Sequence, residues 1–155
     1  MPTLTEMTLD GLYSEFDQLE DWEERCDFLI DLGFQLPELS AEDKSEANRV
    51  HGCQSHVWLV ATPEAAIPGE PPRIRFRANS DAMIVSGLIA VIELMYNGQT
   101  AREILDIDPR VAFKKLDLDK HLSSARRNGL SGMVQRIRQI AAESLVENEQ
   151  VTSDK

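Results

Sequence analysis

The residues best suited to chemistry lie just before a short apolar run, where residues 51–56 read His-Gly-Cys-Gln-Ser-His. Cys53 follows a glycine and precedes two polar residues, a setting more typical of a turn than of a core. The thiolate of cysteine is the nucleophile, and a nearby histidine such as His51 or His56 would raise its fraction. The pattern favours covalent sulfur chemistry at Cys53, although a small apolar side chain packed under a loop fits the spacing equally well.

Other cysteine chemistries fit the sequence less well. The second cysteine, Cys26, lies on the apolar stripe of an expected helix, as core cysteines do. A zinc site is not expected, because residues two and three apart from Cys53 rarely converge and no fourth ligand is evident. A cysteine hydrolase would need a histidine base, and the spacing singles out none of His51, His56 and His121. No Cys-x-x-Cys pair is present, so the sequence predicts single-thiol chemistry without a metal.

Several helices are expected to position this segment. Apolar residues recur at helical spacing over 8–20 and 21–32, and residues 82–95 are apolar nearly all round, as in a central helix. Ser80 is expected to cap this central helix, with Asp81 in its first turn and Gly87 at a close packing contact. Further helices are expected over 100–105, 111–116 and 129–145, followed by a polar tail over 147–155.

Two short strands are expected between these helices. Residues 57–60 are rich in β-forming side chains, and residues 73–77 alternate between arginines and apolar residues. A loop over 63–72 would join them as an antiparallel pair, and a third strand is expected near Arg49 and Val50. The sequence therefore predicts an α+β fold in which a small antiparallel sheet of about three strands is covered by helices. The whole chain, 1–155, is expected to be a single domain.

The charge of the chain is strongly uneven. The net charge is −11, yet residues 1–48 alone hold 14 acidic and 2 basic residues. An acidic helical face is either simply solvated or steers the protein toward a basic partner, and it argues against nucleic acid as a ligand. The apolar stretch over 83–95 is too short and too interrupted to span a membrane, and the first ten residues lack the pattern of a signal peptide. A cytoplasmic protein is therefore expected.

Four groups of residues, taken together, have a recognisable pattern. Residues 48–58 surround Cys53, residues 22–25 read Trp-Glu-Glu-Arg, residues 80–82 read Ser-Asp-Ala ahead of Gly87, and residues 121–123 read His-Leu-Ser ahead of Arg126. In their order along the chain, they closely resemble the SufE family of sulfur acceptors. The resemblance covers about residues 9–142, which are expected to form the core of the domain. The resemblance implies a SufE/IscU-like fold.

The resemblance also implies a function. SufE-like proteins take sulfane sulfur from a pyridoxal-phosphate-dependent cysteine desulfurase, here SufS- or CsdA-like, and thereby stimulate its turnover. They hold the sulfur as a cysteine persulfide and pass it to an iron–sulfur cluster scaffold, here SufBCD-like. The acceptor maps to Cys53. No cofactor is expected on this chain, because pyridoxal phosphate belongs to the desulfurase. The chain would act as a sulfur-transfer partner rather than a stand-alone enzyme, as a monomer or homodimer.

The resemblance assigns further roles around Cys53. Arg126 is a candidate stabiliser of the thiolate or persulfide anion, with a surface ion pair as the alternative. Asp81 is either a helix-terminal charge or a partner contact, and His56 stands where relatives often have glutamine. The residues expected to shape the loop or bind the partner are His51, Gly52, Gln54, Ser55, His56 and Asp81. Two other functions stay open: a non-covalent allosteric activator of a desulfurase, and a redox sensor oxidised at Cys53.

Overall fold

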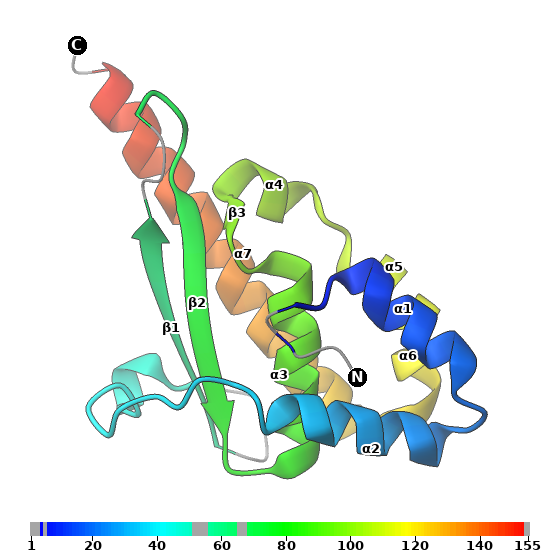
Figure 1. Ribbon diagram of the computed structural model, residues 1–155. Coiled ribbons are helices and arrows are strands. Elements are labelled where there is room, and N and C mark those ends of the chain that lie inside the picture. Colours follow the sequence, from blue (N-terminus) through cyan, green and yellow to red (C-terminus); the bar gives the residue numbers. More distant parts are fainter. Residues whose placement is uncertain (1–3, 5, 51–55, 65–67, 154–155) are drawn as a thin grey trace.

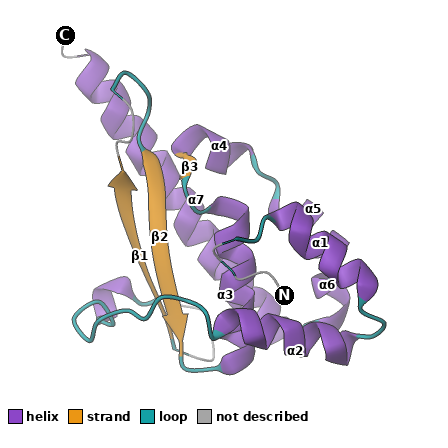
Figure 2. Ribbon diagram, viewed as in Figure 1, coloured by secondary structure: helices purple, strands orange, loops and turns teal. Residues whose placement is uncertain are grey.

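The computed structural model describes residues 4, 6–50, 56–64 and 68–153, and it confirms the predicted α+β fold (Figure 1). A long hairpin lies along one side, the helix α3 lies at the centre, and α1 and α2 lie on the side of α3 away from the hairpin (Figure 2). The elements in order are α1 (Leu9–Gln18), α2 (Trp22–Gly33), the 3-10 helix η1 (Glu46–Asn48), β1 (Val57–Glu64), β2 (Arg73–Ser80), α3 (Met83–Tyr96), β3 (Gln99–Thr100), α4 (Ala101–Asp106), α5 (Pro109–Lys115), α6 (Leu118–His121) and α7 (Ser124–Ser153).

The sheet in the described part of the chain has the order β1-β2-β3, with antiparallel neighbours. The third strand is β3, and the expectation of a third strand at Arg49 and Val50 is wrong. Those residues contribute an isolated bridge between Arg49 and Trp58. A strand of two residues is too short to produce an alternating pattern, which explains why the sequence did not indicate β3.

The hairpin strands are longer than expected, because β1 continues through Pro63 to Glu64. The carbonyl of Val57 accepts from the amide of Val50, so the odd-numbered residues of β1 direct their backbone groups away from β2. Pro63 lies on this outer edge. A proline there removes no hydrogen bond from the β1–β2 ladder, and the strand tolerates it.

One face of the hairpin is buried and the other is charged. The predicted alternation in β2 is confirmed: Ile74 and Phe76 are buried, and the arginines between them are exposed. These arginines form ion pairs within the chain. Arg75 contacts Glu64 at 3.0 Å, and longer contacts of 3.7 Å join Arg77 to Asp43 and Arg73 to Glu103.

The helices α2 and α3 approach each other through two glycines. A Cβ atom on Gly33 would lie 2.7 Å from the backbone nitrogen of Gly87, and one on Gly87 would lie 2.6 Å from the carbonyl oxygen of Leu29. Side chains at these positions would collide with backbone, so the close packing predicted at Gly87 is confirmed and its partner is α2.

The start of α3 and both ends of α7 differ from expectation. Ser80 does not cap α3: it ends β2, while Ala82 is the N-cap and makes no side-chain capping bond. Asp81 accordingly lies before the N-cap rather than in the first turn. The last helix begins at Ser124 instead of residue 129, and its backbone continues to Ser153 through the segment expected to fray. Among the helices that the structure describes, none combines the length and apolarity required to cross a membrane.

Candidate functional site

The segment around Cys53 begins and ends at one place in the fold. Cys53 lies outside the described residues, as do His51, Gly52, Gln54 and Ser55. Its flanking residues are described. The amide of Val50 donates to the carbonyl of Val57 at 2.8 Å, next to the bridge between Arg49 and Trp58. The residues on either side of this segment therefore lie next to each other, at the start of β1.

His56, the first described residue after this segment, is held by Asp81. The amide of His56 donates to Oδ1 of Asp81 at 3.0 Å, and the imidazole Nδ1 lies 2.9 Å from Oδ2. The amide of Asp81 donates back to the carbonyl of His56 at 3.3 Å. These contacts hold His56, the residue that follows the segment around Cys53, against the chain just ahead of α3, so two of the predicted site residues lie together.

The electrostatics of this pair follow from its geometry. The side-chain hydrogen bond from His56 holds the pKa of the Asp81 carboxyl below its usual value of 3.8. A carboxylate beside Nδ1 favours the neutral tautomer that carries its proton on Nδ1, which leaves a lone pair on Nε2. Both side chains are about half exposed.

An aromatic and cationic stack continues from His56 along the outer face of the sheet. The rings of His56 and Trp58 are nearly parallel, with centroids 5.7 Å apart, and Nζ of Lys44 lies 5.7 Å from the centroid of the Trp58 ring. Lys44 comes from the polar segment after α2. No periodic pattern joins it to Trp58, so sequence reasoning missed this contact.

Asn79 was also missed, and it holds the segment after α2 against β2. Its Oδ1 accepts from the amide of Leu39 at 2.6 Å, and its Nδ2 donates to the carbonyl of Pro37 at 3.0 Å. In the sequence, such a bridging amide is visible only as one polar residue within a strand. The segment that carries Lys44 is thereby tied to the strand beside Trp58.

Arg126 lies in the first turn of α7 and is exposed. Its positive charge acts on Cys26 of α2, where it opposes the burial that raises the pKa of this thiol. Cys26 lies in the N-terminal half of α2, whereas the last turn of α2 borders a cleft that Asp81 also lines. The predicted role of Arg126 at Cys53 stays a prediction. His121 stacks on Trp22, with ring centroids 4.5 Å apart.

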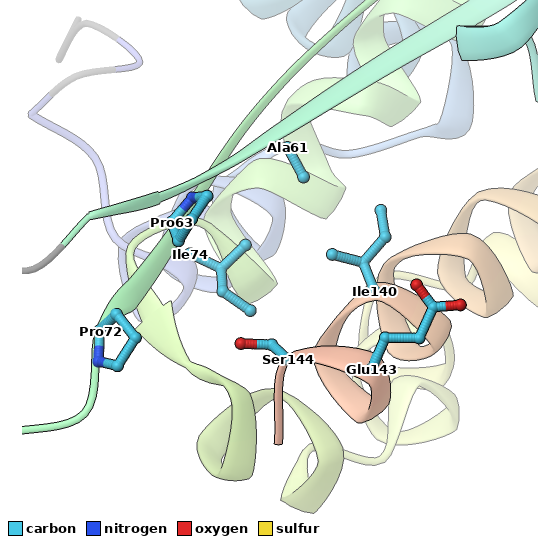
Figure 3. A pocket seen from close by; sticks show the side chains of 7 residues that line it. All are labelled: Ala61, Pro63, Pro72, Ile74, Ile140, Glu143 and Ser144. Carbon is cyan, nitrogen blue, oxygen red and sulfur yellow. The ribbon is translucent and has the colours of Figure 1, made fainter. Parts of the chain in front are cut away.

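The described residues offer no metal centre, since no group of three or more His, Cys, Asp or Glu side chains among them could hold a metal ion. The cavity in Figure 3, about 240 Å³ in volume, lies at the opposite end of the hairpin from His56. The described residues that line it come from β1, the start of β2 and α7. They are mainly aliphatic, and Glu143 is the one ionisable residue among them.

Comparisons with known proteins agree with this fold. The model of the SufE family, described as an Fe–S metabolism associated domain, matches residues 10–141. An uncharacterised SufE-like protein of Rhizobium etli is 45% identical over 134 residues, which cover 86% of this chain and 89% of that protein. Another, from Rhizobium meliloti, is 41% identical over 131 residues, which cover 84% and 92%.

A solved structure shares the fold. The solution structure of a hypothetical protein from Thermus thermophilus superposes with a TM-score of 0.65 at 19% identity, and the match covers 90% of this chain and 99% of that one. At this identity the likeness concerns the fold alone. The family match extends over most of the chain and includes the segment around Cys53 as well as Asp81 and Arg126. The chain therefore belongs to the SufE family, the family of the Fe–S metabolism associated domain.

Proposed function

We propose that this protein accepts sulfane sulfur from a pyridoxal-phosphate-dependent cysteine desulfurase as a persulfide on Cys53. It then delivers the sulfur to an iron–sulfur cluster scaffold and so stimulates desulfurase turnover. The observation that carries the proposal is the SufE-family match over residues 10–141, which contains the Gly-Cys-Gln-Ser sequence at 52–55. The partners in this proposal are a SufS- or CsdA-like desulfurase and a SufBCD-like scaffold, in the cytoplasm.

The transfer step needs one thiolate and no external oxidant. The Cys53 thiolate attacks the outer sulfur of the donor persulfide, R–S–SH, and a new S–S bond forms as the donor S–S bond breaks. The donor cysteine leaves as a thiolate with the bonding electron pair, and the transferred sulfur keeps its proton. The same exchange, repeated with an acceptor thiolate, discharges Cys53.

Three described residues have supporting roles in this proposal at residues 51–55, which we call the acceptor segment. Asp81 and His56 hold the end of the segment, and the lone pair on Nε2 of His56 can accept a hydrogen bond near the site. Arg126 stabilises the thiolate or persulfide anion as a charged hydrogen-bond donor. The neighbouring Arg127 is a matched control: sulfur transfer should slow in Arg126→Ala and not in Arg127→Ala. Equal rates in both would remove Arg126 from the mechanism.

The proposal is tested by desulfurase turnover in the presence of the full chain. Cys53→Ser should abolish the stimulation, and Cys26→Ser, which changes the half-buried thiol of α2, should retain it. If Cys53→Ser stimulated the desulfurase as strongly as the wild type does, the protein would be an allosteric activator and not a sulfur carrier. Reaction of Cys53 with peroxide, without any sulfur transfer, would instead indicate a redox sensor.

A further inference from the structure

Two large apolar side chains are exposed on the same cleft. Phe34 and Met83 are 71% and 61% exposed, and only two other large apolar side chains among the described residues, Val111 and Val146, are comparably exposed. Phe34 and Met83 line one cleft of about 190 Å³, to which Ile30 adds further apolar surface. Val111 and Val146 stand apart on α5 and α7. Exposed apolar surface concentrated at a cleft is typical of an interaction site.

The fold holds these two side chains in place. Phe34 is the C-cap of α2 and directly follows Gly33, while Met83 is the first residue of α3. The contact between Gly33 and Gly87 brings these two helix ends together at backbone distance. The apolar surface is therefore formed in the free protein, and a partner does not have to order it.

The cleft adjoins the anchor of the acceptor segment. Asp81 lines it, and the same carboxylate holds the amide and the imidazole of His56 at 3.0 and 2.9 Å. A partner segment seated against Phe34 and Met83 thus lies next to the end of the segment that carries Cys53.

The rim of the cleft is acidic. Among the described residues that line it, Asp81 is the one ionisable side chain, and Asp31 is exposed on the adjoining turn of α2. In the neighbouring cavity, which shares Gly33 and Phe34, the ammonium of Lys44 is paired with Glu38 at 3.3 Å. Two copies of this chain would bring like charges together, so charge complementarity favours a basic partner over self-association.

We infer that Phe34 and Met83 form a docking surface for a segment of the cysteine desulfurase that presents an apolar side chain flanked by arginine or lysine. The inference rests on the proposed function and names the surface by which this chain recognises its sulfur donor. Docking there sets the affinity for the desulfurase, while the reactivity of Cys53 is independent of it.

The test measures the affinity of the full chain for a purified cysteine desulfurase from the same organism. The Phe34→Ser/Met83→Ser double variant should bind at least about ten-fold more weakly, as loss of central apolar contacts does. Phe34→Leu/Met83→Leu, which keeps the surface apolar, should bind within a few-fold of wild type. Val111→Ser/Val146→Ser, the matched control for exposed apolar area, should bind as wild type does.

Persulfide transfer from cysteine persulfide, a small donor that needs no docking, separates this inference from the proposed function. The double serine variant should accept sulfur from it at the wild-type rate. Wild-type affinity of that variant for the desulfurase would overturn the docking surface and leave the carrier function intact. A wild-type dimer that dissociates on Phe34→Ser would overturn it too, by assigning the surface to self-association. Absence of any sulfur on wild-type Cys53 with either donor would overturn the function itself.

Discussion

At the scale of single residues, His56 and Asp81 give the site its clearest described geometry. The carboxylate of Asp81 holds both the backbone and the side chain of His56, the residue that directly follows residues 51–55. Their exposure limits what the pair adds to global stability, because exposed ion pairs contribute little. We therefore assign the pair a local task, which is to fix where the chain returns from Cys53 into β1.

Replacement of Asp81 tests this local task. Asp81→Ala should accelerate hydrogen exchange at the His56 amide, which loses its acceptor, and should change the free energy of unfolding by less than about 1 kcal/mol. Asp31→Ala, which removes an exposed acid from α2, is the control and should leave the His56 amide unchanged. Unaltered protection of His56 in Asp81→Ala would show that other contacts hold the chain there.

Glu93 is a second residue whose environment has a measurable consequence. It lies on the central helix α3, and burial raises the pKa of its carboxyl from 4.5 to about 7. The unfolded chain releases this proton near pH 4.5, whereas the folded chain retains it up to about pH 7. The free energy of unfolding should therefore fall as the pH rises between these two values.

Glu93→Gln should remove this loss of stability, because an amide does not ionise. At pH 8 the variant should exceed the wild type by roughly 1–3 kcal/mol, the scale set by a shift of this size in a partly buried group. At pH 4 the two proteins should be similar. Urea unfolding at both pH values measures the difference, with the exposed Glu42→Gln as control. A Glu93→Gln variant that loses as much stability as the wild type between pH 4 and pH 8 would contradict the buried carboxyl.

At the scale of elements, the α2–α3 pair determines the surroundings of the site. The two glycines let the helices approach to backbone contact, and this contact sets the start of α3 beside the end of α2. Asp81 immediately precedes that start, so the anchor of His56 depends on the same packing.

Gly87→Ala should therefore destabilise the fold despite the higher helix propensity of alanine. Its Cβ would lie 2.6 Å from a backbone oxygen, and overpacking of this kind costs about 1–3 kcal/mol. Gly11→Ala is the control, since its Cβ would meet the side-chain hydroxyl of Thr8 at 3.3 Å instead of closely packed backbone. Thermal unfolding measures both. A Gly87→Ala variant as stable as the wild type would mean that the helices separate at little cost.

The elements with strong periodic patterns could be predicted from the sequence. The two N-terminal helices, the alternating strand β2 and the apolar helix α3 all occur where their patterns placed them. Termini set by tertiary contacts could not be predicted. Ser80 ends a strand instead of capping α3, and Asp81 binds His56 across 25 positions of sequence, a contact that no local pattern encodes.

At the scale of the whole molecule, the charge is concentrated on one part of the chain. Residues 1–48 hold 14 acidic residues, and those of α1 and α2 lie largely at the surface. The sequence indicated that the charge is uneven, but not where the acidic residues lie on the folded protein. The fold puts the end of the acidic helix α2 on the cleft that Asp81 also lines.

If the proposed desulfurase is the partner, this charge distribution predicts a salt-sensitive encounter with it. The association rate should fall several-fold when the ionic strength rises from about 0.05 M to about 0.5 M, because screening shortens the range of the acidic field. The dissociation rate should change less. Stopped-flow mixing measures both rates, and a salt-independent association rate would mean that the acidic surface is only solvated.

Only those parts of the site that belong to sequence motifs could be predicted. Residue types and the family resemblance predict a site at Cys53 and its neighbours, and this stays a prediction. The contacts of Lys44 and Asn79 depend on how the segment after α2 folds over the sheet. The pairing of His56 with Asp81 likewise required the structure, although both residues were candidates.

The intact mass of the protein after sulfur donation tests the central claim most directly. The chain is mixed with a cysteine desulfurase, cysteine and pyridoxal phosphate, and its mass is measured without reductant. We predict a gain of one sulfur atom that maps to Cys53, is retained in Cys26→Ser and is absent in Cys53→Ser. An unchanged mass beside an active desulfurase that binds the chain would contradict the persulfide carrier.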